Sequence, residues 1–202
     1  VGTHKKFYIE QGGRYYDITP VRKTTTNAAT LAASNGSTTI TVTDNGHGAE
    51  VGDFVTFAGF VTLGGNITAA VLNTEHEITA VTSANVYTFT ATATANGSDS
   101  GNGTSVASET VEYQENIGKE GQTALTGWGA GAWNEAGTTW NNSGTTTFGI
   151  RLWHQQNFGE DLVLGFDGGK LYTWDVTNGI STRGVLVSSL ACLLYTSDAA
   201  DE

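Results

Sequence analysis

The side chains best suited to chemistry in this sequence are its histidines, because imidazole serves both as a metal ligand and as a proton carrier near neutral pH. They are His4, His47, His76 and His154, and they share no spacing typical of a zinc site. His47 lies in the turn 44–48, where Glu50 or Asp53 could join it on a metal, but we expect an exposed turn residue. His76 lies between two glutamates that could raise its pKa, and we expect it on a solvated face rather than acting as a base.

Paired carboxylates are the next candidates, because glycoside hydrolysis needs two carboxyl groups roughly 5–10 Å apart across a cleft. The acidic residues considered are Glu160, Asp161, Asp167 and Asp175. Neighbouring side chains on a strand point to opposite faces, so Glu160 and Asp161 cannot form such a pair. A glycosidase would therefore have to depend on Asp167 or Asp175, which we regard as the weakest of the possible functions.

A calcium loop is the last chemical candidate, because Asp99–Gly103 begins like one. Position 12 of that loop should be a glutamate, and Thr110 stands there instead. No nucleophile elbow, P-loop or dinucleotide-binding fingerprint occurs in the sequence. We therefore predict no catalytic residue, no cofactor and no metal site, and we expect that the chain is not an enzyme.

The elements that would position any site are strands. The middle of the chain alternates apolar and polar residues with period two over Thr38–Thr43, Asp53–Phe57, Glu77–Val81 and Val86–Thr92. Asn-Gly and Gly-Gly pairs separate these segments, as in tight turns. Ile67–Leu72 is expected to form one short helical turn, and Gly97–Ser108 a mobile loop. This pattern predicts a small β-barrel or sandwich.

An internal repeat occupies the two flanks of the chain. Residues 7–19 read FYIEQGGRYYDIT and residues 164–177 read LGFDGGKLYTWDVT. Each copy has a strand, a Gly-Gly turn followed by a cation, and an aromatic strand that ends in Asp-Ile-Thr or Asp-Val-Thr. With a third strand at Val185–Leu190, the two hairpins predict β-propeller blades. The predicted fold class is therefore all-β, with partial propeller blades and an inserted small β-barrel or sandwich module.

The net charge of −11 is unevenly distributed. Residues 1–23 carry five basic and two acidic residues, whereas residues 24–118 carry nine acidic residues and no lysine or arginine. A segment without cations cannot hold phosphates by ion pairing, so the middle module is not a nucleic-acid clamp. An acidic surface would repel DNA and let it slide past, although a simple solubilising surface explains the same charge. No run of apolar residues is long enough for a membrane-spanning helix.

Glycines separate two tryptophans in the segment Gly127–Trp133. Such aromatics could stack on sugars or on bases, or they could pin a long loop to the body of the protein. The first interpretation supports an alternative function, that of a carbohydrate-binding surface or a secreted β-protein.

Several segments, taken in order, resemble the tail-tube (nozzle) or packaged-DNA stabilisation proteins of podovirus-type bacteriophages. They are Gly2–Arg22, Gly127–Trp133, Leu152-Trp153, Asn157–Leu162, Gly168-Gly169 and Tyr172–Asp175. The resemblance covers about half of the chain and implies a propeller body, a ring of subunits below the portal and a channel for DNA. The turn Gly165–Gly168 departs from the family pattern. The middle module separately resembles small β-barrel insertions in phage tail proteins, through Thr41–Asp44, Gly46–Gly48, Val51–Asp53 and Val55–Phe57.

These observations predict four regions. Residues 1–23 form a blade segment, 24–118 an inserted acidic β-barrel module, 119–191 a blade segment with the Trp/Gly loop, and 192–202 a translated sequencing-adapter artefact that contains the lone Cys192. We expect a fragment of a virion protein of the phage tail. Its expected partners are copies of itself in a ring, other tail or portal proteins, and DNA that passes without sequence-specific binding, with no membrane.

Overall fold

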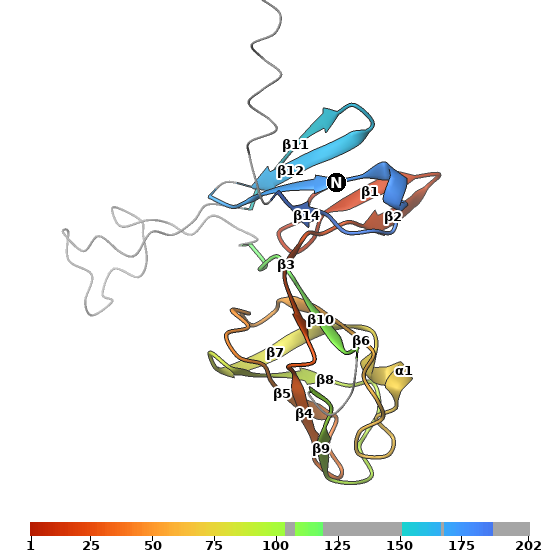
Figure 1. Cartoon of the computed structure of the whole chain (residues 1–202), viewed down its shortest axis with the longest axis vertical. Helices are drawn as coiled ribbons and strands as arrows, with labels where there is room; N and C mark the ends of the chain where they lie inside the picture. Colours follow the sequence, from red (N-terminus) through yellow and green to blue (C-terminus); the bar gives the residue numbers. More distant parts are fainter. Residues whose placement is uncertain (104–107, 119–150, 167, 188–202) are drawn as a thin grey trace, which may run out of the picture.

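The computed structural model describes residues 1–103, 108–118, 151–166 and 168–187 (Figure 1). Its elements are almost all β-strands, which confirms the predicted all-β class. The Trp/Gly segment 127–133, Asp167 and the proposed artefact 192–202 lie outside the described residues. Figure 1 shows two lobes joined through β3 (Val21–Thr26) and β10 (Thr110–Gln114). We call residues 20–117 the insert lobe and the remaining described residues the flank lobe.

The insert lobe consists of eight strands in the order β3-β10-β6-β7-β8-β5-β4-β9, which are part of a larger sheet that continues from β3 into the flank lobe. Its other strands are β4 (Thr30–Ala33), β5 (Thr39–Thr43), β6 (Phe54–Ala58), β7 (Glu75–Ser83), β8 (Val86–Thr90) and β9 (Asp99–Gly101). The long strand β7 pairs with β6 near its start and with β8 over the rest, with two irregularities in register. Such bulges bend a strand, which lets β7 turn the corner between two halves of the sheet. No pairing among the described residues joins β9 to β3, so the predicted barrel is not closed.

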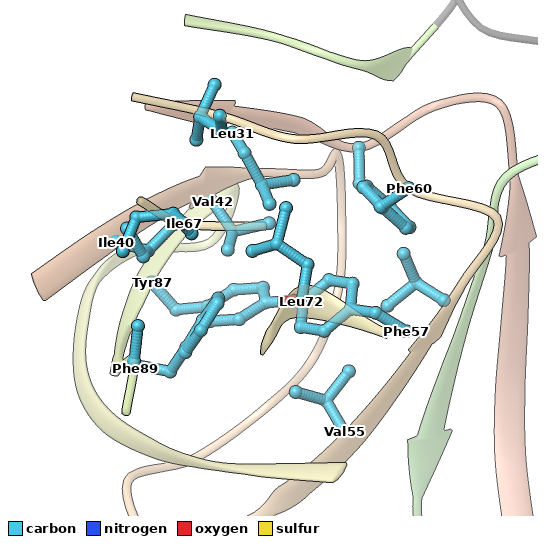
Figure 2. Packing of buried hydrophobic residues seen from close by; sticks show 14 of the residues in the cluster. Leu31, Ile40, Val42, Val55, Phe57, Phe60, Ile67, Leu72, Tyr87 and Phe89 are labelled. Atoms are coloured by element: carbon cyan, nitrogen blue, oxygen red, sulfur yellow. The ribbon is translucent and has the colours of Figure 1, made fainter. Parts of the chain in front are cut away.

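The core of the insert lobe follows the alternation seen in the sequence. In β5, Ile40 and Val42 are fully buried between exposed or half-buried threonines. In β8, Tyr87 and Phe89 are likewise fully buried between exposed or half-buried residues. Figure 2 shows these side chains converging with Leu72 from the helical turn. Burying each such side chain contributes roughly 1.5–3 kcal/mol, so this cluster is the main source of stability in the lobe.

For two shorter segments of the insert lobe, one sequence prediction is confirmed and the other is wrong in part. The predicted helical turn is confirmed as α1 (Ala69–Leu72), which is capped by Thr68, whose side chain accepts from the Val71 amide. The prediction of a loop over Gly97–Ser108 is wrong in part, because β9 forms there and pairs with β4. Strand β9 reads Asp-Ser-Gly, which has no β-forming residue, so its pairing is imposed by the neighbouring strand.

The flank lobe contains the two repeated hairpins. The first is β1 (Tyr8–Gln11) with β2 (Arg14–Asp17), and its turn residues Gly12 and Gly13 have φ of +62° and +78°. Positive φ at both central residues is what a two-residue hairpin turn requires. The second hairpin lies in an antiparallel meander of β11 (Trp153–Phe158), β12 (Asp161–Phe166), β13 (Leu171–Trp174) and β14 (Val185–Leu186). A four-stranded meander is the form of a propeller blade, but the propeller itself stays a prediction.

The two hairpins contact each other through a small second core. Phe7 and Ile18, which flank the first hairpin, are buried against Leu164, Tyr172 and Trp174 from the second. Leu164 is paired with Tyr172 across β12 and β13, so these side chains share one face of the meander. The repeat found in the sequence therefore corresponds to two hairpins that share one small core.

Candidate functional site at the junction of the lobes

Glu75, at the start of β7, is the centre of the contacts between the two lobes. Its Oε2 accepts from Nη2 of Arg183 at 2.7 Å and from Nε2 of Gln114 at 2.5 Å, and its Oε1 pairs with Nζ of Lys6. Lys6 precedes the first hairpin and Arg183 follows the second, so one carboxylate ties both ends of the flank lobe to the insert lobe. Neighbouring Glu77 makes an exposed ion pair with Lys5 at 3.0 Å.

Asp17 completes this network from the flank side. It accepts from Nζ of Lys6 at 2.9 Å and lies 3.2 Å from Nη1 of Arg183. Burial raises the pKa of Asp17, but hydrogen bonds from Lys6 and Thr19 together with the charge of Arg183 hold the pKa below its usual range. Burial lowers the pKa of Lys6, yet its two carboxylate partners outweigh this and leave the pKa raised. Both groups are therefore charged at neutral pH.

The end of each repeated hairpin folds into the same turn. Oδ1 of Asp17 accepts from the Thr19 amide at 3.0 Å and from Thr19 Oγ1 at 2.5 Å. Oδ1 of Asp175 accepts from the Thr177 amide at 2.8 Å and from Thr177 Oγ1 at 2.5 Å. An aspartate that binds the backbone two residues ahead is a defined turn chemistry, which explains why both copies of the repeat end in Asp-x-Thr.

Asp53 organises the segment that leaves the insert lobe. It is 1% exposed, its Oδ1 accepts from the Ile117 amide at 2.8 Å, and its Oδ2 accepts from Nδ2 of Asn116 at 2.6 Å and from the Glu50 amide at 2.7 Å. Nη2 of Arg151 then donates to the Asn116 carbonyl at 2.9 Å. Residues 116–117 are thus held by the buried carboxylate of Asp53 and by the guanidinium of Arg151.

A cleft of about 560 Å³ runs along the junction. It is lined by residues 21–24 of β3, by Glu112, and by residues 181–186. Among the described residues, Nη2 of Arg22, which lines the cleft, and Oε1 of Gln114 on the adjacent strand β10 are buried without a hydrogen-bond partner. Each such atom costs about 1–3 kcal/mol, so the junction carries more polar groups than its own contacts satisfy.

His47 is placed differently from the prediction, because it is 1% exposed instead of lying in an exposed turn. Nδ1 of His47 accepts from the Ala49 amide at 3.0 Å, so Nε2 carries the proton and donates to the Ser83 carbonyl at 3.1 Å. The ring lies 5.0 Å from that of Tyr87. Burial lowers the pKa of His47, and the imidazole acts as a structural group that holds its own loop.

The prediction for His76 is also wrong, since its side chain is buried rather than solvated. Nε2 of His76 donates to the Leu72 carbonyl at 3.0 Å, and the ring centroid lies 4.2 Å from that of Phe89. Burial lowers the pKa of His76, whereas a pair of flanking glutamates had suggested a raised one. The alternation of β7 explains the difference, because Glu75 and Glu77 point to one face and His76 to the other.

The acidic residues of the insert lobe do not all lie on its surface. Asp44, Asp53 and Glu109 are buried, and Glu75, Glu112 and Glu115 are half-buried, which leaves Glu50, Glu77 and Asp99 exposed. Buried Asp44 accepts from Tyr113 Oη at 2.7 Å and from Thr25 Oγ1 at 2.7 Å. The predicted acidic surface is therefore weaker than the sequence suggested, because many of these acids fix turns and strands.

The carboxylates considered for glycoside hydrolysis and for calcium are used in turns where the structure describes their contacts, and Asp167 lies outside the described residues. Asp161 accepts from the Val176 amide at 3.2 Å, and Asp175 holds its own turn. Asp99 accepts from the Gly64 and Ser100 amides, so it stabilises a turn rather than opening a calcium loop. Among the residues that the structure covers, no group of three or more His, Cys, Asp or Glu could hold a metal ion, and no helix is long and apolar enough to cross a membrane.

The chain was compared with protein-family models, curated proteins and solved structures. No protein-family model and no curated protein matches the chain. Four solved protein chains match it. One of them is the phage phi92 endosialidase, with 14% sequence identity and a TM-score of 0.37 over 80% of this chain. The chain spans 24% of the length of that protein, and we therefore take function from the residues of the chain itself.

Sequence reasoning missed the junction. Lys6 and Glu75 are 69 positions apart, and Glu75 and Arg183 are 108 apart, so no local spacing could bring them together. The charge distribution could have indicated the junction. Because residues 24–118 contain no lysine or arginine, any ion pair of their carboxylates must involve cations from outside this segment.

Proposed function

We propose that this chain is a structural component of a phage tail tube, or nozzle, which surrounds the DNA exit channel and helps to retain packaged DNA. The observation that carries the proposal is the repeated design of the two flank hairpins, which share a Gly-Gly pair between their strands and the same Asp-x-Thr turn at their ends. Repetition of one unit is how propeller bodies are built, and the ordered sequence resemblance points to the tail-tube family. Its partners would be copies of itself in a ring, other tail or portal proteins, and DNA that passes without specific binding.

The role of the junction in this proposal is mechanical. The network around Glu75 links Lys6 and Arg183, one from each end of the flank lobe, so the insert lobe also braces the two hairpins against each other. A tail component that withstands the pressure of packaged DNA benefits from such long-range ties. The hydroxyl of Thr74 lies 3.1 Å from Nε2 of His76, but that nitrogen also donates to the Leu72 carbonyl and the ring is buried in the core, and we propose no enzymatic activity.

The test is genetic and structural. Phage particles produced without the gene for this protein should lack complete tails and should lose packaged DNA, as judged by electron microscopy and by nuclease sensitivity of the genome. Particles with complete tails and protected DNA would exclude the proposal. Specific hits of the purified chain on a glycan array would favour the alternative, a carbohydrate-binding surface or secreted β-protein.

A further inference from the structure

The two equivalent turns differ in what covers them. In the first hairpin, Ile18 and Thr19 are fully buried, and Asp17 contacts two cations. In the second hairpin, Val176 is 39% exposed, and among the described residues the side chain of Asp175 accepts only from Thr177. The carboxylate of the same local structure therefore contacts two cations in the first copy, whereas in the second copy no cation among the described residues pairs with it and Asp161 accepts from the Val176 amide.

The cover on the first turn comes from the second repeat. Residues 182–184 follow the second turn, and Nε1 of Trp174 donates to the Thr182 carbonyl at 3.0 Å. Arg183 reaches Asp17, and the Gly184 amide donates to the Ile18 carbonyl at 3.1 Å. One repeat thus covers the turn of the preceding repeat with a guanidinium and a backbone amide.

The meander that carries the second turn also exposes apolar side chains. Thr173 pairs with Val163 on one side and with Val185 on the other, so these three share the face opposite to the buried Tyr172 and Trp174. Val185 is 65% exposed, and Phe158, which lies on the same face by its pairing with Asp161, is 55% exposed. A large apolar side chain exposed next to a carboxylate is typical of a surface that another protein element contacts.

We propose that Asp175, Val176, Phe158 and Val185 form a docking surface for a third hairpin of the same design, which supplies an arginine to Asp175 as Arg183 is supplied to Asp17. The charge of the partner follows from the first turn, where two cations surround the equivalent carboxylate. Asp175 lies in an Asp-x-Thr turn already formed, so the carboxylate is oriented before the partner arrives. A second copy of the chain is the less suitable occupant, since its own Arg183 is held by its own Asp17 and Glu75.

The experiment uses the full chain and a fluorescently labelled synthetic peptide with the sequence of residues 161–187, which reproduces the second hairpin and its arginine. Binding is followed by fluorescence anisotropy. We expect saturable binding that Asp175→Asn in the chain weakens by at least about five-fold, because a charge-assisted contact is replaced by a neutral one. Asparagine keeps the turn, since its side-chain oxygen accepts the same backbone bond.

The controls locate the contact. Arg183→Gln in the peptide should weaken binding to the same extent, and combining it with Asp175→Asn in the chain should add little further loss. Glu160→Gln, which removes an exposed charge from the same meander, should leave binding unchanged. No binding at all, or binding that is indifferent to Asp175→Asn, would overturn the proposal. Self-association of the chain that depends on Asp175 would overturn it as well, in favour of a second copy as the occupant.

Discussion

At the residue scale, Glu75 shows how one partly buried carboxylate can join distant parts of a chain. Its two oxygens contact Lys6, Gln114 and Arg183, and the side chain keeps 29% of its exposure. The Glu75 carboxylate stabilises the fold through all the groups that it pairs with, because buried Lys6 and half-buried Arg183 would otherwise have fewer partners.

Replacing Glu75 by glutamine should therefore lower the free energy of unfolding by about 1–3 kcal/mol, since two cations lose their shared counter-charge. The matched control is Glu77→Gln, which removes an ion pair whose side chains are 39% and 49% exposed and which should cost at most about 1 kcal/mol. Urea unfolding followed by tryptophan fluorescence measures both. Equal effects of the two substitutions would show that the junction network does not stabilise the fold.

The two buried histidines predict a pH dependence of stability. Burial lowers the pKa of both His47 and His76 from the ordinary value of 6.5. The unfolded chain therefore takes up protons at a higher pH than the folded chain does, so stability is complete above about pH 6.5 and falls as the pH drops below it. Asp17, whose folded pKa also lies below its usual 3.8, should add a further loss in more acidic solution.

The measurement is the urea midpoint as a function of pH for the chain and for its His47→Gln and His76→Gln variants. Each variant should be less stable at neutral pH and should show a shallower decline in acid, because one titrating group is gone. An unchanged midpoint across the range in which histidine titrates would contradict the burial of both rings.

At the scale of elements, glycines mark where backbone segments approach each other most closely. Gly59 follows β6 with a φ of +80°, and a Cβ placed on it would lie 2.4 Å from the carbonyl oxygen of Ser108. Gly36 has a nearly identical φ of +79° but no neighbour within 4 Å of such a Cβ. Comparing substitutions at Gly36 and Gly59 therefore distinguishes the cost of a positive φ from the cost of steric overlap.

Gly36→Ala should cost about 1 kcal/mol for the positive φ alone, whereas Gly59→Ala should cost about 3 kcal/mol or more because a backbone carbonyl must also move. Thermal unfolding by circular dichroism measures the difference. If the two variants melt at the same temperature, residue 108 does not approach β6 as described.

An element could be predicted from the sequence when neighbouring residues determine it, and could not when it depends on partners far along the chain. The strands β5 and β8 and the turn Gly12-Gly13 are encoded by neighbouring residues, through period-two alternation and positive φ. Strand β9 and the burial of His47 depend instead on partners far along the chain, namely β4 and the Ser83 carbonyl. The Glu75 junction is the extreme case, because none of its partners is within reach of a local pattern.

At the scale of the whole molecule, the charge blocks of the sequence become complementary surfaces. The sequence has no lysine or arginine between residues 24 and 118, and Glu75 and Glu77 of the insert lobe are neutralised by Lys5, Lys6 and Arg183 from the flank lobe. The unequal charge of the insert lobe and the flank lobe thus provides the ion pairs that hold the two lobes together. High salt should weaken the exposed pair at Glu77 more than the partly buried network at Glu75.

The insert lobe should fold when it is excised, but its boundaries matter. Strand β3 begins at Val21, and Lys23 pairs with Tyr113 of β10 and lies over its ring. A piece spanning 20–117 keeps this cover, whereas a piece that begins at residue 24 loses the first half of β3. We expect both to give β-type circular dichroism, with the shorter piece less stable by about 1–3 kcal/mol.

Thermal and urea unfolding of the two pieces tests this expectation. A longer piece that melts without cooperativity would show that the insert lobe needs the flank lobe in order to fold. Equal stability of the two pieces would show that residues 20–23 do not contribute to the core.

The pairing of β3 with β10 also affects how such a chain can evolve. The Pro20 carbonyl accepts from the Glu115 amide at 2.9 Å, so the two ends of a region of nearly one hundred residues lie side by side, as the ends of a tight turn would. To the flank hairpins this region is equivalent to a short loop, because its ends impose almost no separation. The coding segment could therefore be lost, exchanged or acquired by recombination as a single cassette, provided that the incoming segment also begins and ends on neighbouring strands.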